Sequence, residues 1–283
     1  PLLLSSAASD VYKRQIYSTF VIEERHGFNK TTKKTFVTDI FKSLFISGAI
    51  SSILYATVIF IIISAGDLWW IYAFAAVFTL QAIIFFLYPV LIMPLFNKFE
   101  PLDDEQFKKP IEKLLEKVDF KSKGLFVMNA SLRSTHGNAF FTGFGKNKRI
   151  VFFDTLLKTI NPDEMEAILG HELGHYKLGH IRKTLISSLV FGFLGFYILN
   201  EIFKSDNFFI AHGLENLTVY SKFLMFYLVI GSYTFFTKPI TSALSRKREF
   251  EADDFSFQFT DGEHMISGVL KLTKDNLSLI HIS

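Results

Sequence analysis

The chain has 283 residues, 49% of them hydrophobic and 16% aromatic, with 34 Phe. This composition is too apolar for an ordinary soluble domain and indicates a membrane protein that carries a polar part. The absence of Cys excludes a disulfide framework and a thiolate metal site, so any metal must bind His and carboxylate side chains.

Both ends of the chain read as foreign sequence. The residues DVYKRQ at 10–15 and LSLIHIS at 277–283 back-translate to codons that are reverse complements of each other. They resemble the transposase end used to prepare sequencing libraries. We therefore expect residues 1–15 and 277–283 to be translated adapter, and the chain between them to be an internal fragment.

Two membrane hairpins are expected on either side of a polar domain. Residues 16–42 are polar and mixed, which predicts a loop with a short amphipathic piece. The segment 43–96 holds two uncharged apolar runs, each longer than the ~20 residues that span a bilayer, and Pro89 and Pro94 predict a kinked or unwound exit. The segment 184–244 holds two further runs, of which the last would look similar as a buried soluble helix.

The polar segment 97–183 is expected to form a small α+β domain. Its apolar spacing predicts, in chain order, a helix over 103–118, a strand over 124–128 and a hairpin with arms 139–145 and 149–153 around a turn at 145–148. A further helix follows directly, because Asn161 is a favourable N-cap and Pro162 suits the first helical position.

That helix carries the pattern HELGH at 171–175. His171 and His175 are four residues apart and project from one face, so two neutral imidazoles can reach a single Zn²⁺. Glu172 lies between them, where a carboxylate can polarise an attacking water. The pattern also fits two surface His on an amphipathic helix, and a bare match arises by accident in roughly one such chain in a hundred.

We expect the segment 245–276 to hold a third-ligand helix and a partial C-terminal region. Glu249 and Asp253 are four residues apart and share a helical face, whereas Glu251 points to another. One of the pair can bind the metal while the other accepts the N–H of a ligating His. The alternative is a solvated face beside a basic anchor.

The distribution of Lys and Arg predicts the orientation. If the four apolar runs form two hairpins, the side that carries the HELGH helix holds 26 Lys and Arg, against two, Lys204 and Lys222, on the other side. The positive-inside rule then places the loop 16–42, the domain 97–183 and the chain after residue 237 in the cytoplasm.

Several blocks, in the same order, resemble the Ste24-type CAAX prenyl protease family, the M48 integral-membrane zinc metallopeptidases that are related to HtpX. The matching blocks are YSTFVIEERHGFNK (17–30), RSTHGNAFFTGFGKNKRIVFFDTLL (133–157), HELGHYKLGH (171–180), SRKREFEAD (245–253) and KLTKDNLS (271–278). The resemblance implies a mainly α fold, in which multi-pass membrane helices accompany a zincin-like α+β metallopeptidase domain over 97–183. That domain would have a small β-sheet with an exposed edge strand.

The resemblance also implies roles for single residues. His171, His175 and Glu249 would be the ligands of one Zn²⁺ per chain. Glu172 would be the general base, and Asp253 would support the ligands from behind them.

Further residues of the matching blocks bear on substrate binding. Asn138, Ala139 and Phe140 resemble the strand that pairs with substrate backbone, and an exposed edge strand is suited to that. His136 and His180 match the family without an expected ligand role, since His180 lies off the ligand face as a polar residue at the helix end. Family members have seven spans, so we expect about three upstream spans and a downstream active-site segment to lie outside this chain.

The sequence therefore predicts a membrane-embedded zinc endopeptidase that hydrolyses CAAX-type, prenylated proteins or other membrane-associated proteins. We expect a peptide or protein substrate, with or without a lipid, and membrane lipids as partners, and no nucleic acid. Its catalytic domain would face the cytoplasm, at a bacterial inner membrane or at the endoplasmic reticulum of a eukaryote.

Three alternative functions make different predictions for this sequence. An HtpX-like quality-control protease for membrane proteins is the alternative enzyme. A non-catalytic membrane scaffold with a relict metal site predicts loss of at least one metal-site residue, and all four are present. A transporter would carry polar groups inside its spans, and the first two runs have no charged residue.

Overall fold

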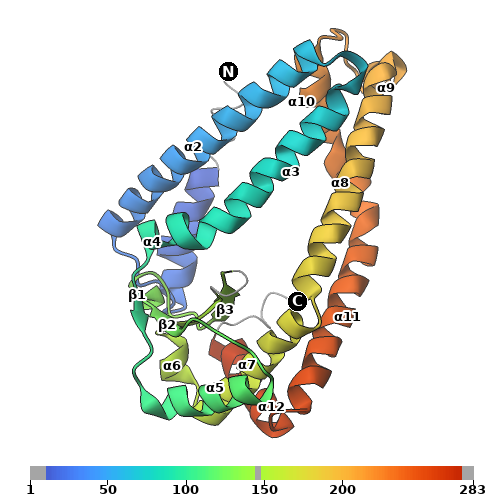
Figure 1. Ribbon diagram of the computed structural model, residues 1–283. Helices are drawn as coiled ribbons and strands as arrows, with labels where there is room; N and C mark the ends of the chain where they lie inside the picture. Colours follow the sequence, from blue (N-terminus) through green and yellow to red (C-terminus); the bar gives the residue numbers. More distant parts are fainter. Residues whose placement is uncertain (1–10, 144–147, 276–283) are drawn as a thin grey trace. The chain divides into compact units, whose positions relative to one another are not determined.

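The computed structural model describes residues 11–143 and 148–275, and it is mainly helical with one four-stranded sheet (Figure 1). Some of the predicted features lie partly outside the described residues, namely the turn at 145–148, the end of the hairpin arm 139–145, the two adapter ends and the end of the KLTKDNLS block. The chain divides into two units, one of residues 1–47, 86–173 and 255–283, the other of residues 48–85 and 174–254.

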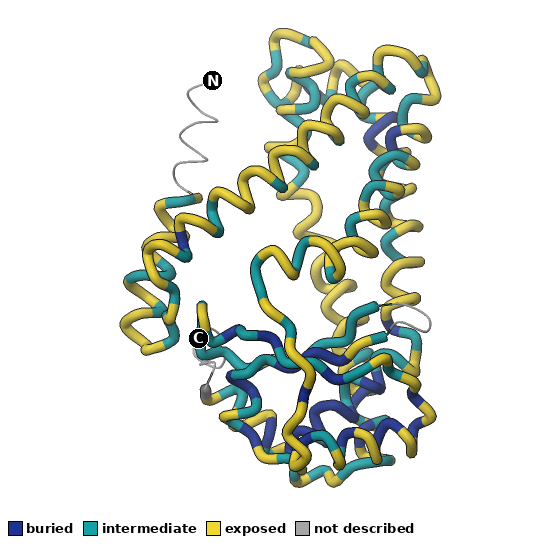
Figure 2. Tube along the Cα trace, turned by 60° about the vertical axis from the view of Figure 1, so that its left-hand side comes forward, coloured by how far each residue is buried: buried dark blue, intermediate teal, exposed yellow. Residues whose placement is uncertain are grey.

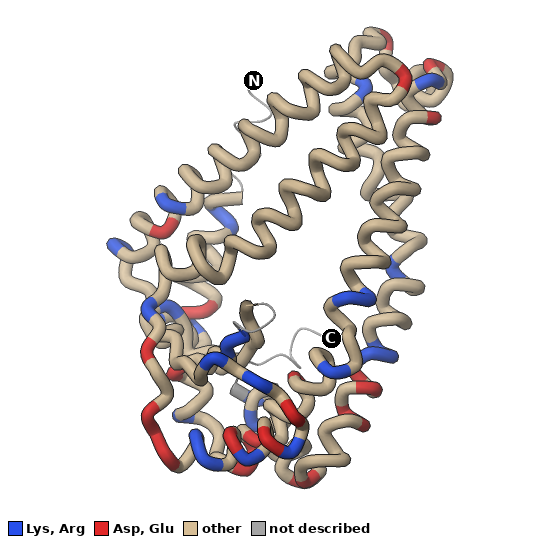
Figure 3. The backbone as a smooth tube through the Cα atoms, viewed as in Figure 1, with Lys and Arg blue, Asp and Glu red and all other residues tan. Residues whose placement is uncertain are grey.

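Within the described residues, four helical stretches are long and apolar enough to cross a membrane, and they fall on the four predicted runs. They comprise α2 (Lys33–Ser64), α3 (Trp69–Leu87) with its continuation to Phe96, α8 (His180–Lys204), and α10 (Val219–Thr234) with α11 (Lys238–Phe257). Figure 2 shows these helices exposed along much of their length, and Figure 3 shows no charged residues along the middle of α2 and α3. Apolar surface of this extent suits contact with lipid.

The first of these helices begins earlier than expected. α2 starts at Lys33, inside the segment 16–42 for which we predicted a loop, and η1 (Ser18–Glu23) is a π-helix. Thr32 Oγ1 accepts a 3.1 Å hydrogen bond from the Thr35 N–H, which satisfies one of the free donors of the first turn. The hydropathy of the sequence marks only the apolar part of a helix, so it missed this polar extension.

The second run ends in irregular helix, as Pro89 and Pro94 predicted. α3 gives way to π-helical η3 (Tyr88–Ile92) and then to the short α4 (Met93–Phe96). Proline lacks the N–H for an α-helical hydrogen bond and its ring clashes with the preceding turn, so the regular helix stops. The chain leaves α4 at Asn97 in an extended conformation.

The sheet has the strand order β1-β2-β4-β3. Its strands are β1 (Phe99–Pro101), β2 (Leu125–Met128), β3 (Ala139–Thr142) and β4 (Arg149–Phe153). β2 and β4 are parallel, whereas the pairs β1–β2 and β3–β4 are antiparallel. The predicted strand and hairpin are confirmed within the described residues. β1 was not predicted, because three residues that include Glu100 and Pro101 carry no strand pattern.

The core of the first unit is built on the central strand. Ile150, Val151 and Phe152 of β4 are at most 1% exposed. α5 (Glu105–Lys117) buries Ile111 and Leu114 completely, in agreement with the predicted apolar spacing of this helix. The remaining helices are α6 (Leu156–Thr159), α7 (Pro162–Lys177), α9 (Asp206–Ala211) and α12 (Gly262–Asp275).

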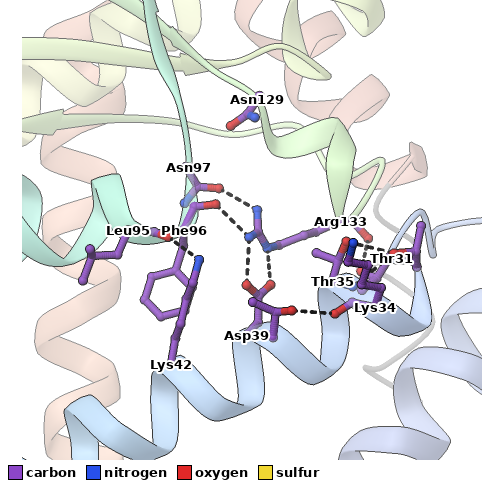
Figure 4. Close-up of polar contacts among 12 residues, drawn as sticks. Thr31, Lys34, Thr35, Asp39, Lys42, Leu95, Phe96, Asn97, Asn129 and Arg133 are labelled. Carbon is purple, nitrogen blue, oxygen red and sulfur yellow. Dashed lines mark hydrogen bonds and ion pairs between the residues drawn. The ribbon is translucent and has the colours of Figure 1, made fainter.

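An arginine fixes the segment that leads into β3 (Figure 4). The Arg133 guanidinium donates two hydrogen bonds, of 2.7 and 3.1 Å, to the carboxylate of Asp39 on α2. It also donates to the Asn97 side chain at 3.0 Å and to the Phe96 carbonyl at 2.7 Å. One planar side chain therefore joins the start of α2, the exit of the second run and the loop before β3.

Candidate metal centre

The helix that carries HELGH is fixed at its start by a reciprocal cap. Asn161 Oδ1 accepts the Glu164 N–H at 2.9 Å, and Glu164 Oε2 accepts the Asn161 N–H at 3.0 Å, which confirms Asn161 as the N-cap of α7. Glu164 is only 2% exposed and also accepts hydrogen bonds from Ser267 Oγ at 2.6 Å and Lys271 Nζ at 2.8 Å. α12 is therefore tied to the first turn of α7.

These contacts set the ionisation of the Glu164 carboxyl. Burial acts to raise its pKa. The hydrogen bonds from Lys271, Ser267 and the Asn161 N–H, together with the positive charge of Lys271, outweigh burial, so the pKa lies below its ordinary value of 4.5. The buried carboxylate is thus charged at neutral pH, and its charge is matched by Lys271.

α7 and α11 approach closely where Gly170 faces Ser256. Ser256 is fully buried, and its Oγ donates a 3.0 Å hydrogen bond to the Ala167 carbonyl of α7. A Cβ placed on Gly170 would lie 2.7 Å from Ser256 Oγ and 3.0 Å from Cγ2 of Thr260. Only glycine therefore permits this approach, which lies one residue before His171.

The approach brings the three predicted ligands together. His171 and His175 lie one turn apart on α7, and Glu249 lies on α11. Each offers one ligand atom, and these atoms all lie within 4.8 Å of one another. His175 Nε2 is 3.5 Å from Glu249 Oε2. The two His are half-buried and Glu249 is exposed, so the group is accessible from one side.

The donor set and its spacing fit zinc. Zinc prefers imidazole nitrogen and carboxylate oxygen at about 2.0–2.2 Å in a tetrahedron, which places two ligand atoms about 3.4 Å apart. The 3.5 Å between His175 Nε2 and Glu249 Oε2 is close to that separation. Three protein ligands also leave the fourth position open, which is the arrangement of catalytic rather than structural zinc sites.

A second histidine stands behind His175, where the sequence predicted only a polar helix end. His180 Nδ1 shares a 2.9 Å hydrogen bond with His175 Nδ1. On its other side His180 Nε2 lies 3.0 Å from Glu251 Oε2. The sequence placed His180 off the ligand face and Glu251 on another helical face than Glu249 and Asp253. Neither assignment foresaw that these two side chains meet behind His175.

The position of His180 depends on a glycine. α7 ends at Lys177, and Gly179 adopts a left-handed conformation with φ of +68° before α8 begins at His180. The chain turns here, so the four-residue spacing of a helical face does not apply between His175 and His180. The glycine in the sequence was the available signal for this turn, because glycine adopts positive φ without strain.

The other predicted site residues lie near these elements. Glu172 follows His171 on α7, and Asp253 lies one turn after Glu249 on α11; both side chains are half-buried. Asn138 is exposed and precedes β3, its side-chain oxygen accepts the Ala139 N–H at 2.9 Å, and its carbonyl accepts the Phe153 N–H at 2.9 Å.

β3 lies at one end of the strand order, as the prediction of an edge strand requires. The bond between Asn138 and Phe153 makes these two a hydrogen-bonded pair, and such pairs alternate along an antiparallel ladder. The backbone N–H and C=O of Phe140, opposite Val151, then point toward β4. Those of Ala139, opposite Phe152, point toward the outer edge of the sheet. Of the predicted strand residues, Ala139 is thus the one whose backbone faces the edge.

The sequence of this chain is similar to those of membrane peptidases. Residues 101–278 match the family model of peptidase family M48, and residues 13–98 match that of the CAAX prenyl protease N-terminal region, described as five membrane helices. The CAAX prenyl protease 1 homolog of Arabidopsis thaliana is 38% identical over 267 residues, which cover 94% of this chain. CAAX prenyl protease 1 of Saccharomyces cerevisiae is 36% identical over 284 residues.

A solved structure agrees with these matches. The crystal structure of S. mikatae Ste24p superposes with a TM-score of 0.86 at 33% identity, and the match covers 97% of this chain and 68% of that one. The chain spans less than two thirds of the curated relatives, namely 63% of the Arabidopsis protein and 62% of the yeast protein.

Proposed function

Because the chain belongs to peptidase family M48, we propose that it is a membrane-embedded zinc endopeptidase acting on CAAX-type, prenylated proteins or other membrane-associated proteins. The observation that carries this proposal is the group of His171, His175 and Glu249, whose ligand atoms lie within 4.8 Å of one another. Glu249 lies more than seventy residues after His175 and on another helix, so helix periodicity alone does not account for their meeting.

His171, His175 and Glu249 would hold one Zn²⁺ through two imidazole nitrogens and one carboxylate oxygen. The metal supplies Lewis-acid activation of water and of the scissile carbonyl group. The close contact of α7 with α11 would fix the relative positions of these ligands. In this proposal Asp253 supports the ligand face of α11 from one turn beyond Glu249.

Glu172 would act as the general base. It follows His171 directly on α7, so its carboxylate would stand beside the ligands rather than among them. In this role the carboxylate takes a proton from the attacking water and later delivers it to the leaving amine. A positioned general base contributes about 10²–10⁴-fold to the rate, which sets the expected effect of its removal.

An extended substrate peptide would add to the edge of the sheet at β3. Main-chain hydrogen bonds along such an edge supply affinity without regard to side chains. Of the residues assigned to substrate binding, Ala139 would offer its backbone, while Asn138 would shape the start of the strand and Phe140 would hold β3 to β4. The edge position of β3 supports this assignment.

The chain is a multi-pass membrane protein, and we place its metal centre on the cytoplasmic side of the membrane. The excess of Lys and Arg on that side supports the assignment. A metal centre close to the bilayer favours substrates that are held at the membrane by a lipid or by their own spans. The CAAX prenyl protease names of the relatives favour the lipid-modified class over an HtpX-like quality-control role.

The test compares the purified protein with Glu172→Gln, and with Glu166→Gln as a control that removes the same charge from the same helix. We expect all three to retain zinc, and only Glu172→Gln to lose cleavage of a farnesylated CAAX peptide, by at least 10²-fold. Equal cleavage by the zinc-loaded Glu172→Gln variant would refute the general-base assignment. Zinc-dependent cleavage of a misfolded membrane protein, without cleavage of the peptide, would favour the quality-control role.

A further inference from the structure

Behind the ligand His175 lies a polar chain that the roles assigned above do not use. It runs from His175 Nδ1 to His180 Nδ1 over 2.9 Å and from His180 Nε2 to Glu251 Oε2 over 3.0 Å. All three residues lie in the second unit of the chain. His180 is 4% exposed, so both of its ring nitrogens must be satisfied within the protein.

The chemistry of the three groups fixes the direction of one hydrogen bond and, for a neutral His180, that of the other. A carboxylate can only accept, so His180 Nε2–H donates to Glu251. A neutral His180 then has a lone pair on Nδ1, which accepts the Nδ1–H of His175. The proton of His175 is therefore held on Nδ1, and the lone pair lies on Nε2, the atom that faces Glu249 at 3.5 Å.

The surroundings of Glu251 keep it an acceptor. Its Oε2 lies 3.7 Å from Lys183 Nζ, and its Oε1 lies 3.9 Å from Lys247 Nζ. These two cations, from α8 and from α11 itself, favour the charged carboxylate. The reverse arrangement of donors would put a proton on His175 Nε2 and exclude that atom from a metal.

We propose that His180 and Glu251 are positioning residues, which hold His175 in the tautomer and ring orientation that presents Nε2 to the metal. This inference rests on the proposed zinc site. It adds to that site two hydrogen bonds in series, from Glu251 through His180 to His175, which we call the relay. It gives His180 a role distinct from the ligand pattern and makes Glu251, rather than Asp253, the carboxylate that stands behind His175. Partners of this kind are worth 10–100-fold in metal affinity at known sites.

The test measures zinc affinity by competition with a chelator of known affinity, on the full chain in detergent at a fixed neutral pH. Four variants are compared with the wild type: Glu251→Gln, His180→Gln, His175→Ala and Asp254→Asn. The last removes the same charge as Glu251→Gln from an exposed position of the same helix. Melting temperatures of the zinc-free proteins report separately on folding.

We expect Glu251→Gln and His180→Gln to weaken zinc binding by about 10-fold or more, Asp254→Asn to leave it unchanged, and His175→Ala to abolish it. Wild-type affinity in both Glu251→Gln and His180→Gln, with loss only in His175→Ala, would overturn the relay and leave the zinc site standing. A lower melting temperature with unchanged affinity would also overturn it, since that is the result of a purely structural role. Failure of the wild type to bind zinc would instead refute the proposed function. Because Glu251 is one third exposed, its variant decides the matter even if His180→Gln does not fold.

Discussion

Because α7 and α11 lie close together at Gly170, we predict that Gly170→Ala moves Glu249 away from His171 and His175. The new methyl group would lie 2.7 Å from Ser256 Oγ and 3.0 Å from Thr260 Cγ2, closer than such atoms pack. The side chain of Ser256 cannot rotate freely, because it is fully buried. Its Oγ is hydrogen-bonded to the Ala167 carbonyl and to Thr260 Oγ1, each at 3.0 Å. The helices must therefore separate by a few tenths of an ångström, or these hydrogen bonds must break.

The expected cost follows from two opposing effects. Overpacking of this kind costs about 1–3 kcal/mol, whereas replacing glycine by alanine within a helix contributes up to about 1 kcal/mol of stability. We expect a net loss of about 1 kcal/mol and weaker zinc binding, because Glu249 moves away from the two His. Thermal unfolding and chelator competition in detergent measure the two effects.

Two variants control for this reasoning. Gly195→Ala on α8 places its methyl group in open space, so it should leave stability unchanged or raise it. Ser256→Ala removes the nearest atom, so it should recover part of the loss in the Gly170→Ala background. The reasoning is refuted if Gly170→Ala matches Gly195→Ala in both stability and zinc affinity.

Three further changes test the supports of the site. The pKa of Glu164 is lowered in the folded state, so its contribution to stability is present above pH 4.5 and is lost as the pH falls through the folded-state pKa. Glu164→Gln should therefore be less stable at neutral pH, and its melting temperature should fall less steeply toward acid pH. Parallel curves of melting temperature against pH for the two proteins would contradict this. Gly179→Ala should lower the free energy of unfolding by about 1–2 kcal/mol, because the residue has a φ of +68°. Gly179→Asn should lower it less in the same assay. Equal losses would contradict a left-handed conformation at this turn. Arg133→Lys should lower the free energy of unfolding by about 1–3 kcal/mol, because it loses the paired hydrogen bonds to Asp39. The same change should have a smaller effect in an Asp39→Ala background, and an equal effect in both would rule out the pairing.

Local patterns in the sequence were sufficient for most of the elements. The cap at Asn161, the apolar face of α5 and the arms of the β-hairpin depend on neighbours within a few residues, and the structure has them where the sequence predicted. The four apolar runs were equally visible, since a bilayer requires about 20 apolar residues irrespective of tertiary contacts. The start of α2 at Lys33 was not visible, because it depends on a cap and not on hydropathy.

The candidate site was predictable only in part. The spacing of His171 and His175 follows from the helix, and Glu249 and Asp253 shared a face that left either of them open as a ligand. That Glu249 meets the two His depends on Gly170 and Ser256, which no periodic pattern marks. The hydrogen bond between His180 and His175 was not foreseen, because counting residues along a helix assumes that the helix continues, and Gly179 ends it.

X-ray absorption at the zinc edge tests the central claim most directly. The zinc-loaded protein should show nitrogen and oxygen neighbours at about 2.0–2.2 Å with the scattering of two imidazoles. Glu249→Gln should weaken zinc binding and change the light-atom shell without removing the imidazoles. A spectrum with fewer than two imidazoles, or one unchanged in Glu249→Gln, would contradict the assignment of His171, His175 and Glu249 as the metal centre.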